Sequence, residues 1–127
     1  MIERLNPSNM HAPIGAYVHH NISPPGARLY ASAGQLGVTP SGELLADPRE
    51  QIAEAWLNVG RWLEAVQLKA SDVLRLTVFM TSAEHVEHSR ECRRKLLGDV
   101  VTGNTLIYVS ALADPKMVIE IDILAAA

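Results

Sequence analysis

A capped amphipathic helix in the middle of the chain is the feature that most constrains the fold. Asp47 can cap its start, Pro48 suits the first helical position, and Glu50 can close a capping box. Apolar residues then recur at helical spacing on a single stripe, namely Ile52, Ala55, Trp56, Val59, Trp62, Leu63 and Val66. A helix with one apolar stripe must bury it against another element, so we predict that this helix covers a β-sheet and that both tryptophans pack in the core.

The segments around this helix show the alternation of β-strands. Turn residues at 23–26 separate two strand-like segments, which predicts two strands joined by a turn. We predict strands over 15–22, 27–34, 70–81, 104–112 and 116–125, with a further turn and short strand within 39–45. One face of the 70–81 strand carries Leu74, Leu76, Val78 and Met80. The last strand presents isoleucines on one face and two carboxylates on the other.

A second helix follows the 70–81 strand. It is predicted to begin near Thr81-Ser82, with Glu84 in a capping box, and to end at Gly98. Arg90 and Arg93 lie beside its apolar stripe, which indicates a helix that borders a cleft or a subunit boundary. The element order predicts an α+β fold in which two helices pack on one face of a mixed sheet. Because the other face stays uncovered, we expect the chain to form oligomers.

Composition excludes several functional classes. At 127 residues the chain is expected to form a single domain over 1–127, and its net charge of −3 makes a nucleic-acid partner unlikely. The basic run at 93–95 has glutamates nearby and is interpreted as a solvated helix face. A single cysteine and the lack of a long apolar run lead us to expect a soluble cytoplasmic protein without a membrane segment.

Glu120 and Asp122 are the strongest candidates for chemistry. At i and i+2 on a strand they point to the same face, roughly 7 Å apart by the strand rise. Desolvation and like charge on an apolar face favour a carboxyl group that can exchange a proton near neutrality, as a general acid or base must. The alternative is that they reach solvent or pair with a basic side chain such as Arg75.

The remaining reactive residues carry less information. The histidines, including His85 and His88, have no carboxylate or cysteine at a spacing that would complete a metal site, so we predict none. Cys92 lies next to two arginines that could lower the pKa of its thiol, but an idle or mildly reactive thiol is the preferred interpretation. Motifs of nucleotide-binding loops, serine hydrolases and zinc proteases do not occur.

Several segments in their order and spacing resemble one known family. They are "APIGAY" at 12–17, "LYASAGQLG" at 29–37, "GELLADPREQIAEAWLNVGRWLEAV" at 42–66, "ASDVLRLTVFMT" at 70–81 and "LIYVSALADPKMVIEIDILA" at 106–125. The chain resembles the Rid family, also called YjgF or endoribonuclease L-PSP-like, from about residue 12 onward, which leaves 1–11 as an N-terminal extension. The resemblance implies a chorismate-mutase-like fold and a homotrimer with a ligand cleft at each subunit interface.

The resemblance also implies a chemistry and its residues. RidA-type members hydrolyse reactive imines and enamines to a ketoacid and ammonia without a cofactor. Their glutamate on the last strand, which helps to position water, corresponds to Glu120, and their carboxylate-binding arginine corresponds to Asn104. Loss of a charge-assisted bidentate contact in a cleft costs about 2–5 kcal/mol. We therefore interpret the chain as a divergent member that lacks the catalytic arginine, and we do not expect efficient deamination of 2-imino acids.

Other positions depart from the family pattern or match it. The family's "SGQ" becomes "SAGQ" here, which brings Ser32, Ala33 and Gly34 into the predicted pocket. Arg90 stands where the family often has asparagine and could supply a cationic group, or could merely pair with Glu120 or Asp122 across the cleft. The full predicted set is Glu120 as catalytic residue, with Tyr17, Ser32, Ala33, Gly34, Arg90, Asn104 and Asp122 as substrate-binding residues.

Three functions remain open at this point. The first is a hydrolase, deaminase-like, that acts on a reactive imine or enamine other than the usual 2-imino acids. The second is a non-catalytic trimer that binds a small metabolite in the cleft between subunits. The third, the nuclease activity attached to the family by name, is the weakest because the chain is acidic and lacks a surface of interleaved basic and aromatic residues.

Overall fold

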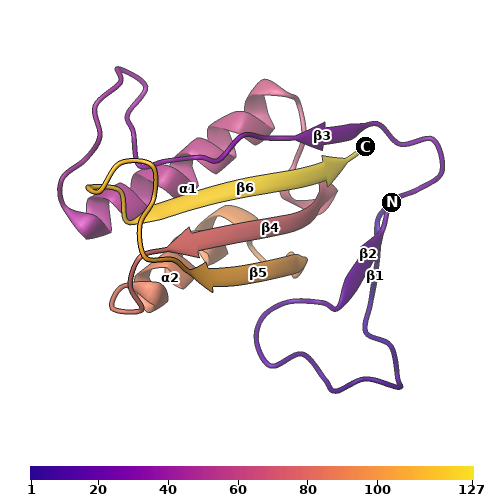
Figure 1. Cartoon of the computed structure of the whole chain (residues 1–127). Helices are drawn as coiled ribbons and strands as arrows, with labels where there is room; N and C mark the ends of the chain where they lie inside the picture. Colours follow the sequence, from indigo (N-terminus) through magenta and orange to yellow (C-terminus); the bar gives the residue numbers. More distant parts are fainter.

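The computed structural model describes residues 1–127, which form an α+β fold (Figure 1). The helices are α1 (Pro48–Ala65) and α2 (Val86–Leu97), and a 3-10 turn covers Ala70–Asp72. The strands are β1 (Glu3–Leu5), β2 (His20–Ile22), β3 (Leu29–Ala31), β4 (Val73–Met80), β5 (Gly103–Tyr108) and β6 (Ile119–Ala126). None of the helices is long and apolar enough to span a membrane.

The main sheet has the order β3-β6-β4-β5, and both helices lie on one of its faces (Figure 1). β4 and β5 run parallel, while β6 is antiparallel to β3 and to β4. The predicted mixed sheet with two helices on one face is therefore confirmed. The opposite face has no covering element in the chain.

Helix α1 begins at the predicted residue, but the Glu50 side chain does not close the predicted capping box. The Asp47 carboxylate accepts a hydrogen bond of 3.0 Å from the backbone N–H of Glu50, and Pro48 is the first helical residue. The apolar stripe lies against the sheet and includes fully buried Ile52 and Val59. Trp56 is buried as predicted, and Trp62 packs at the edge of the same core.

A β-bulge changes which residues of β4 enter the core. The register against β6 shifts between Val73 and Arg75, so Val73 is fully buried while Leu74 is only partly buried. Beyond the bulge, Leu76, Val78 and Met80 alternate into the core as predicted. The expectation for Leu74 is wrong because strand alternation assumes a regular register, which an inserted residue breaks.

The N-terminal segment differs most from the prediction. The expected pairing across the turn at 23–26 does not form, because β2 pairs with β1 whereas β3 pairs with β6. Arg4 fastens this small β1–β2 ribbon to the main sheet: its guanidinium donates to Asn21 Oδ1 at 2.9 Å and to the carbonyl oxygens of Val73 and Ser71, each at 2.9 Å. The predicted N-terminal extension thus contributes structure to the fold.

Replacing Arg4 with alanine should destabilise the chain by about 1–3 kcal/mol, because the carbonyl groups that it satisfies lose a charged donor. Burial already lowers the pKa of the Arg4 guanidinium, which shows that the side chain is partly removed from water. The free energy of unfolding in urea measures the effect. An Arg4→Lys variant keeps the charge without the planar fork, so it should recover only part of the loss. Unchanged stability in both variants would show that the ribbon is not fastened by this residue.

Helix α2 starts later than predicted. Its first residue is Val86, with His85 at the N-cap, whereas the Ser82 hydroxyl accepts a hydrogen bond from the Glu84 N–H in a turn that precedes the helix. Its end at Gly98 is confirmed, and the φ of +60° at that position favours glycine. Arg90, Arg93 and Arg94 all lie within the observed helix.

Candidate functional site

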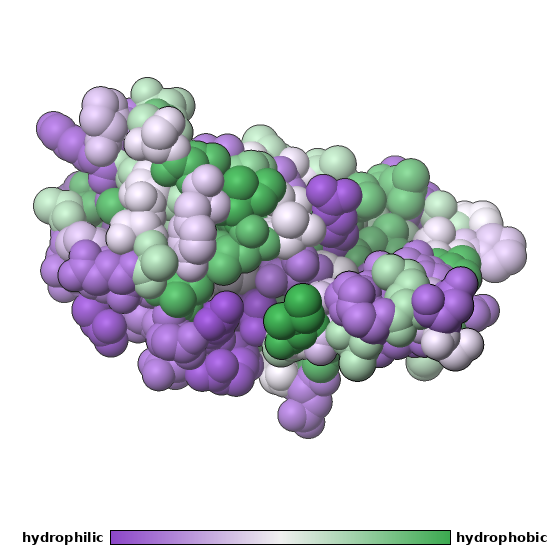
Figure 2. All heavy atoms as spheres, turned by 60° about the horizontal axis from the view of Figure 1, so that its bottom comes forward, coloured by the Kyte–Doolittle hydropathy of each residue, from purple (hydrophilic) through white to green (hydrophobic).

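A cavity of about 470 Å³ opens between α2, the edge strand β5 and the loop before β2. Figure 2 shows a surface on which apolar side chains gather next to a strongly polar region. The cavity, hereafter the arginine pocket, is lined by Ile14, Gly15, Ala16, Tyr17, Trp56, Val78, Val86, Glu87, Ser89, Arg90, Arg93, Arg94, Asn104 and Leu106. It combines an apolar wall with an unusual concentration of positive charge.

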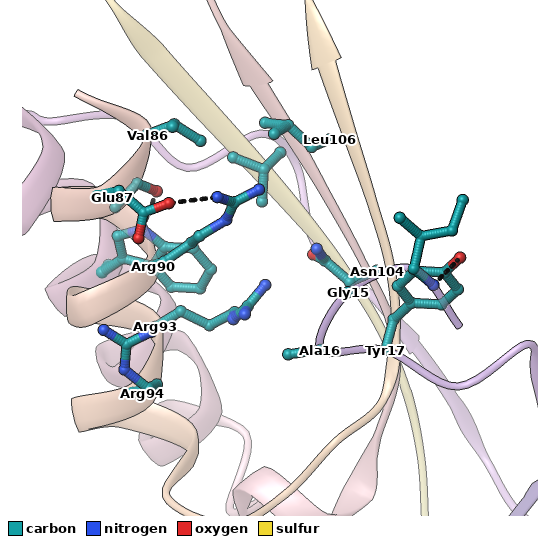
Figure 3. A pocket seen from close by; sticks show the side chains of 14 residues that line it. Gly15, Ala16, Tyr17, Val86, Glu87, Arg90, Arg93, Arg94, Asn104 and Leu106 are labelled. Atoms are coloured by element: carbon teal, nitrogen blue, oxygen red, sulfur yellow. Dashed lines mark hydrogen bonds and ion pairs between the residues drawn. The ribbon is translucent and has the colours of Figure 1, made fainter. Parts of the chain in front are cut away.

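Helix α2 supplies the charged wall of the pocket. Arg90, Arg93 and Arg94 stand at i, i+3 and i+4 and therefore share one side of the helix (Figure 3). Arg90 forms an ion pair with Glu87. The side chains of Arg93 and Arg94 make no hydrogen bond or ion pair within the chain.

The surroundings of Arg93 lower the pKa of its guanidinium. Burial lowers the pKa of its guanidinium, the charges of Arg90 and Arg94 lower it further, and Glu87 opposes the shift. A guanidinium remains protonated at neutral pH even so. The pocket therefore holds an incompletely neutralised positive charge, which an anionic ligand would stabilise.

Asn104 faces the arginines from β5 (Figure 3). Its Oδ1 atom is buried and accepts no hydrogen bond in the chain. A buried carbonyl oxygen without a donor is costly, so this atom is available to a ligand that carries an N–H or O–H group.

Tyr17 and Trp56 shape the pocket from two other directions. The Tyr17 hydroxyl accepts a hydrogen bond of 3.1 Å from the backbone N–H of Ile14, which holds the loop in a tight turn. The indole N–H of Trp56 donates to Ser89 Oγ at 3.0 Å and is thereby satisfied within the protein. Trp56 therefore has its only donor satisfied, whereas the Tyr17 hydroxyl can still donate a hydrogen bond to a ligand.

The remaining predicted site residues lie on the bare face of the sheet. Ser32 and Asp122 line a second cavity of about 370 Å³ there. The Ser32 hydroxyl accepts a hydrogen bond of 3.0 Å from the Ile123 N–H, so it helps to join the chain after β3 to β6. Ala33 follows Ser32, and its carbonyl accepts a hydrogen bond from the Gln35 side chain.

Glu120 and Asp122 share this bare face, as their spacing predicts, because both alternate with buried isoleucines. The Glu120 carboxylate lies over Gly34, where an added Cβ would be 2.2 Å from Oε2. Neither carboxylate forms an ion pair, so the alternative that they pair with Arg75 is not observed. The sheet separates them from the arginine pocket within one chain.

The structure thus divides the predicted site into two groups. Tyr17, Arg90 and Asn104 line one pocket, whereas the serine motif and the two carboxylates lie on the opposite face. Within the chain Arg90 pairs with Glu87. A pair of Arg90 with Glu120 or Asp122 across the cleft between two copies stays a prediction.

Sequence reasoning did not assign Arg93 and Arg94 to the site. The interpretation of 93–95 as a solvated face is wrong for Arg93, which is partly buried, and incomplete for Arg94, which is exposed but lines the pocket. The i, i+3 spacing of Arg90 and Arg93 beside an apolar stripe was the signal, and it did indicate a cleft. The spacing alone could not show that Arg90 forms an ion pair with Glu87 while Arg93 forms none.

The Cys92 thiol is not activated by the two neighbouring arginines, as one of its two interpretations suggested. Burial raises the pKa of its thiol, an effect larger than the opposing charge of Lys95. Its Sγ lies 3.8 Å from Nε2 of His88, one helical turn away, and His88 also contacts the Arg49 carbonyl. Nearby arginines therefore do not activate this thiol. No group of three histidine, cysteine or acidic side chains is placed to hold a metal ion.

The rate at which iodoacetamide alkylates Cys92 should rise at higher pH in the native protein than in the urea-unfolded chain, because folding favours the protonated thiol. By linkage, this stabilising contribution is present below about pH 9, the ordinary thiol value, and is lost as the pH rises through the raised pKa. Lys95→Gln should shift the alkylation profile of the native protein to still higher pH, whereas Glu91→Gln should shift it to lower pH. Identical native and unfolded profiles would contradict the inferred shift.

The fold and most of the sequence match known proteins. The family model for endoribonuclease L-PSP matches residues 8–127. A RutC family protein from Aquifex aeolicus is 26% identical over 95 residues, which cover 73% of this chain and 76% of that protein. One similar solved structure is that of YyfB from Yersinia pestis, a protein of unknown function in the conserved Rid protein family. It has a TM-score of 0.86 and 25% identity, and the match covers 99% of this chain and 98% of that chain.

A structure of TdcF from E. coli with bound serine has a TM-score of 0.72 at 24% identity and covers 91% of both chains, which shows likeness of fold. The family model spans nearly the whole chain, and the Yersinia structure agrees with it over almost every residue. The chain therefore belongs to the endoribonuclease L-PSP family, the Rid/YjgF family that its sequence resembles.

Proposed function

We propose that this protein binds a small anionic metabolite in the arginine pocket. The observation that carries the proposal is the pairing of an unpartnered guanidinium with an unpartnered acceptor across one cavity. Arg93 forms no ion pair, and Asn104 Oδ1 accepts no hydrogen bond. A ligand with a carboxylate and an N–H group would satisfy both sides of the pocket at once.

The reaction that we propose is hydrolysis of a reactive imine or enamine other than the usual 2-imino acids. Water adds to the carbon of the C=N bond, the carbon–nitrogen bond then breaks, and a carbonyl compound and ammonia are released. Glu120 is the candidate base that takes the proton from water. The two unpaired carboxylates on the bare face support this role.

A homotrimer would be needed to bring these groups together. Within one chain the sheet separates Glu120 from the arginine pocket. The bare face exposes apolar side chains, among them Ile107 and Leu124, which favours burial against another copy. We propose that a neighbouring copy completes the pocket in a cytoplasmic trimer, as the family resemblance implies.

Binding without catalysis is the second candidate. It is favoured by the same observation, since Arg93 and Asn104 suffice to hold a ligand, whereas no carboxylate except Glu87 lines the pocket. The two functions differ at Glu120, because a purely binding protein should tolerate Glu120→Gln with little loss.

Ammonia release from freshly generated imines distinguishes these possibilities. With 2-imino acids we expect wild-type rates only slightly above the uncatalysed rate, and a gain in Asn104→Arg, which restores the family's guanidinium. Robust wild-type activity that is abolished in Glu120→Ala but kept in the exposed control Glu64→Gln would contradict the argument from Asn104. The arginines of α2 would then hold the substrate. Absence of turnover on every imine, with binding retained, would favour the second candidate.

A further inference from the structure

The ion pair between Arg90 and Glu87 lies inside the arginine pocket (Figure 3). Both residues belong to α2 and stand at i and i+3, so the carboxylate reaches Arg90 from the preceding helical turn. Three guanidinium groups line the pocket, and Glu87 is the only carboxylate among the lining residues. Glu87 thus forms its ion pair with Arg90, and its charge offsets only part of the shift at Arg93, which has no ion pair of its own.

This ion pair is exposed enough to be exchanged for another partner. The Glu87 side chain is 72% exposed and that of Arg90 is 45% exposed. Exposed pairs of this kind contribute little to stability, because water competes for both partners. Arg90 can therefore exchange the Glu87 carboxylate for a ligand anion with little loss of folding stability.

Two guanidinium groups on one wall of the pocket suit a ligand with two anionic ends. Arg90 and Arg93 are one helical turn apart, a spacing that places Cβ atoms about 5–6 Å from each other. From this spacing, two long and flexible arginine side chains can reach both carboxylates of a four- or five-carbon dicarboxylate. A monoanionic ligand would occupy one arginine and leave the other as it is.

We propose that the natural ligand of the arginine pocket carries two anionic groups, one held by Arg93 and the other by Arg90, where it replaces the Glu87 carboxylate. The inference rests on the proposed function and names the substrate class: a short dicarboxylate or a compound of the same charge pattern. Glu87 acts as an internal stand-in for the second anionic group when no ligand is bound. Arg90 thereby determines specificity, while Arg93 provides the contact that all anionic ligands share.

Calorimetric titration with succinate and with its monoamide, succinamate, tests the proposal, because the two probes differ only in the second charge. Wild type should bind succinate roughly tenfold more tightly than succinamate, after correction for the two equivalent ends of succinate. In Arg90→Gln the ratio should fall to about one, with succinamate binding unchanged. Glu87→Gln should increase the ratio, because the competing carboxylate is removed.

The possible failures are distinguishable. If wild type binds neither probe, the proposed anion site is wrong, and the further inference fails with it. If both probes bind equally well, or if Arg90→Gln weakens both to the same extent, the proposed function stands and the dianionic class is wrong. Should Arg90→Gln fail to fold, Glu87→Gln still decides, since an unchanged ratio in that variant would overturn the stand-in role. Arg61→Gln, which removes an arginine of α1 outside the pocket, should leave the ratio unchanged.

Discussion

Replacing Arg93 with glutamine should weaken the binding of succinate by about tenfold to a hundredfold, the loss expected when a charged hydrogen bond in a partly desolvated site is removed. Arg93 is the one partly buried guanidinium of the pocket, and it makes no hydrogen bond or ion pair in the chain. Burial lowers the pKa of its guanidinium, and repulsion by the charges of Arg90 and Arg94 lowers it further. A bound carboxylate therefore relieves this repulsion in addition to forming its own contact.

The same change should stabilise the unliganded fold slightly or leave it unchanged, since it removes a buried positive charge near two others. This combination separates loss of a contact from loss of structure. Arg93→Lys keeps the charge but not the bidentate fork, so its affinity should lie between those of wild type and Arg93→Gln. Equal succinate affinity in wild type and Arg93→Gln, with Arg61→Gln as the matched control, would refute the anion site.

Replacing Gly37 with alanine should cost about 3 kcal/mol of stability and lower the melting temperature by roughly 10 °C. An added Cβ would lie 2.2 Å from Gln51 Cγ and 2.3 Å from the backbone oxygen of the same residue. The backbone oxygen belongs to the first turns of α1 and cannot move without displacing the helix. Gly37 is therefore required for space rather than for backbone conformation.

The Gly37→Ala substitution should also affect β6, because the buried Gln51 side chain that it would displace is hydrogen-bonded to the start of that strand. Its amide donates to the carbonyls of Leu45 and Lys116, and its oxygen accepts a hydrogen bond of 2.6 Å from the Val118 N–H just before β6. Displacement of Gln51 would therefore disturb the strand that carries Glu120.

Thermal unfolding followed by circular dichroism measures the effect of Gly37→Ala. Gly15→Ala is the matched control, because its nearest contact would be an ordinary 3.8 Å from the Tyr17 ring. Equal melting temperatures in the two variants would show that α1 can shift away from the loop.

Local patterns in the sequence were sufficient for the elements that depend on neighbouring residues. The Asp47 cap, the buried stripe of α1, the alternation of β6 and the glycine at the end of α2 all follow from rules that span a few residues. The shared face of Glu120 and Asp122 followed from the same alternation. The resemblance to the Rid family drew on the order of such segments along nearly the whole chain, and the family match confirmed it.

Pairing between distant segments was decided only in the tertiary structure. Whether β2 pairs with β3 or with β1 depends on partners far along the chain, and the Arg4 contacts to Ser71 and Val73 favour the latter arrangement. The bulge in β4 likewise depends on the pairing with β6. Because of it, Val73 is buried in the core where the sequence pattern predicted Leu74. Such alternatives are similar in local energy, so long-range contacts select among them.

For the candidate site too, the sequence indicated which residues could take part, and the tertiary structure decided which of them contact one another. The resemblance to the Rid family predicts that Asn104 stands in place of an arginine. The sequence by itself placed Arg90 beside a cleft and two carboxylates on one strand face. Only the tertiary structure decided that Arg90 is paired with Glu87, that Arg93 is left without a counter-ion and that the sheet separates Glu120 from both. The physical reason is that a residue's type and spacing define its possible partners, whereas burial and distance select the actual one.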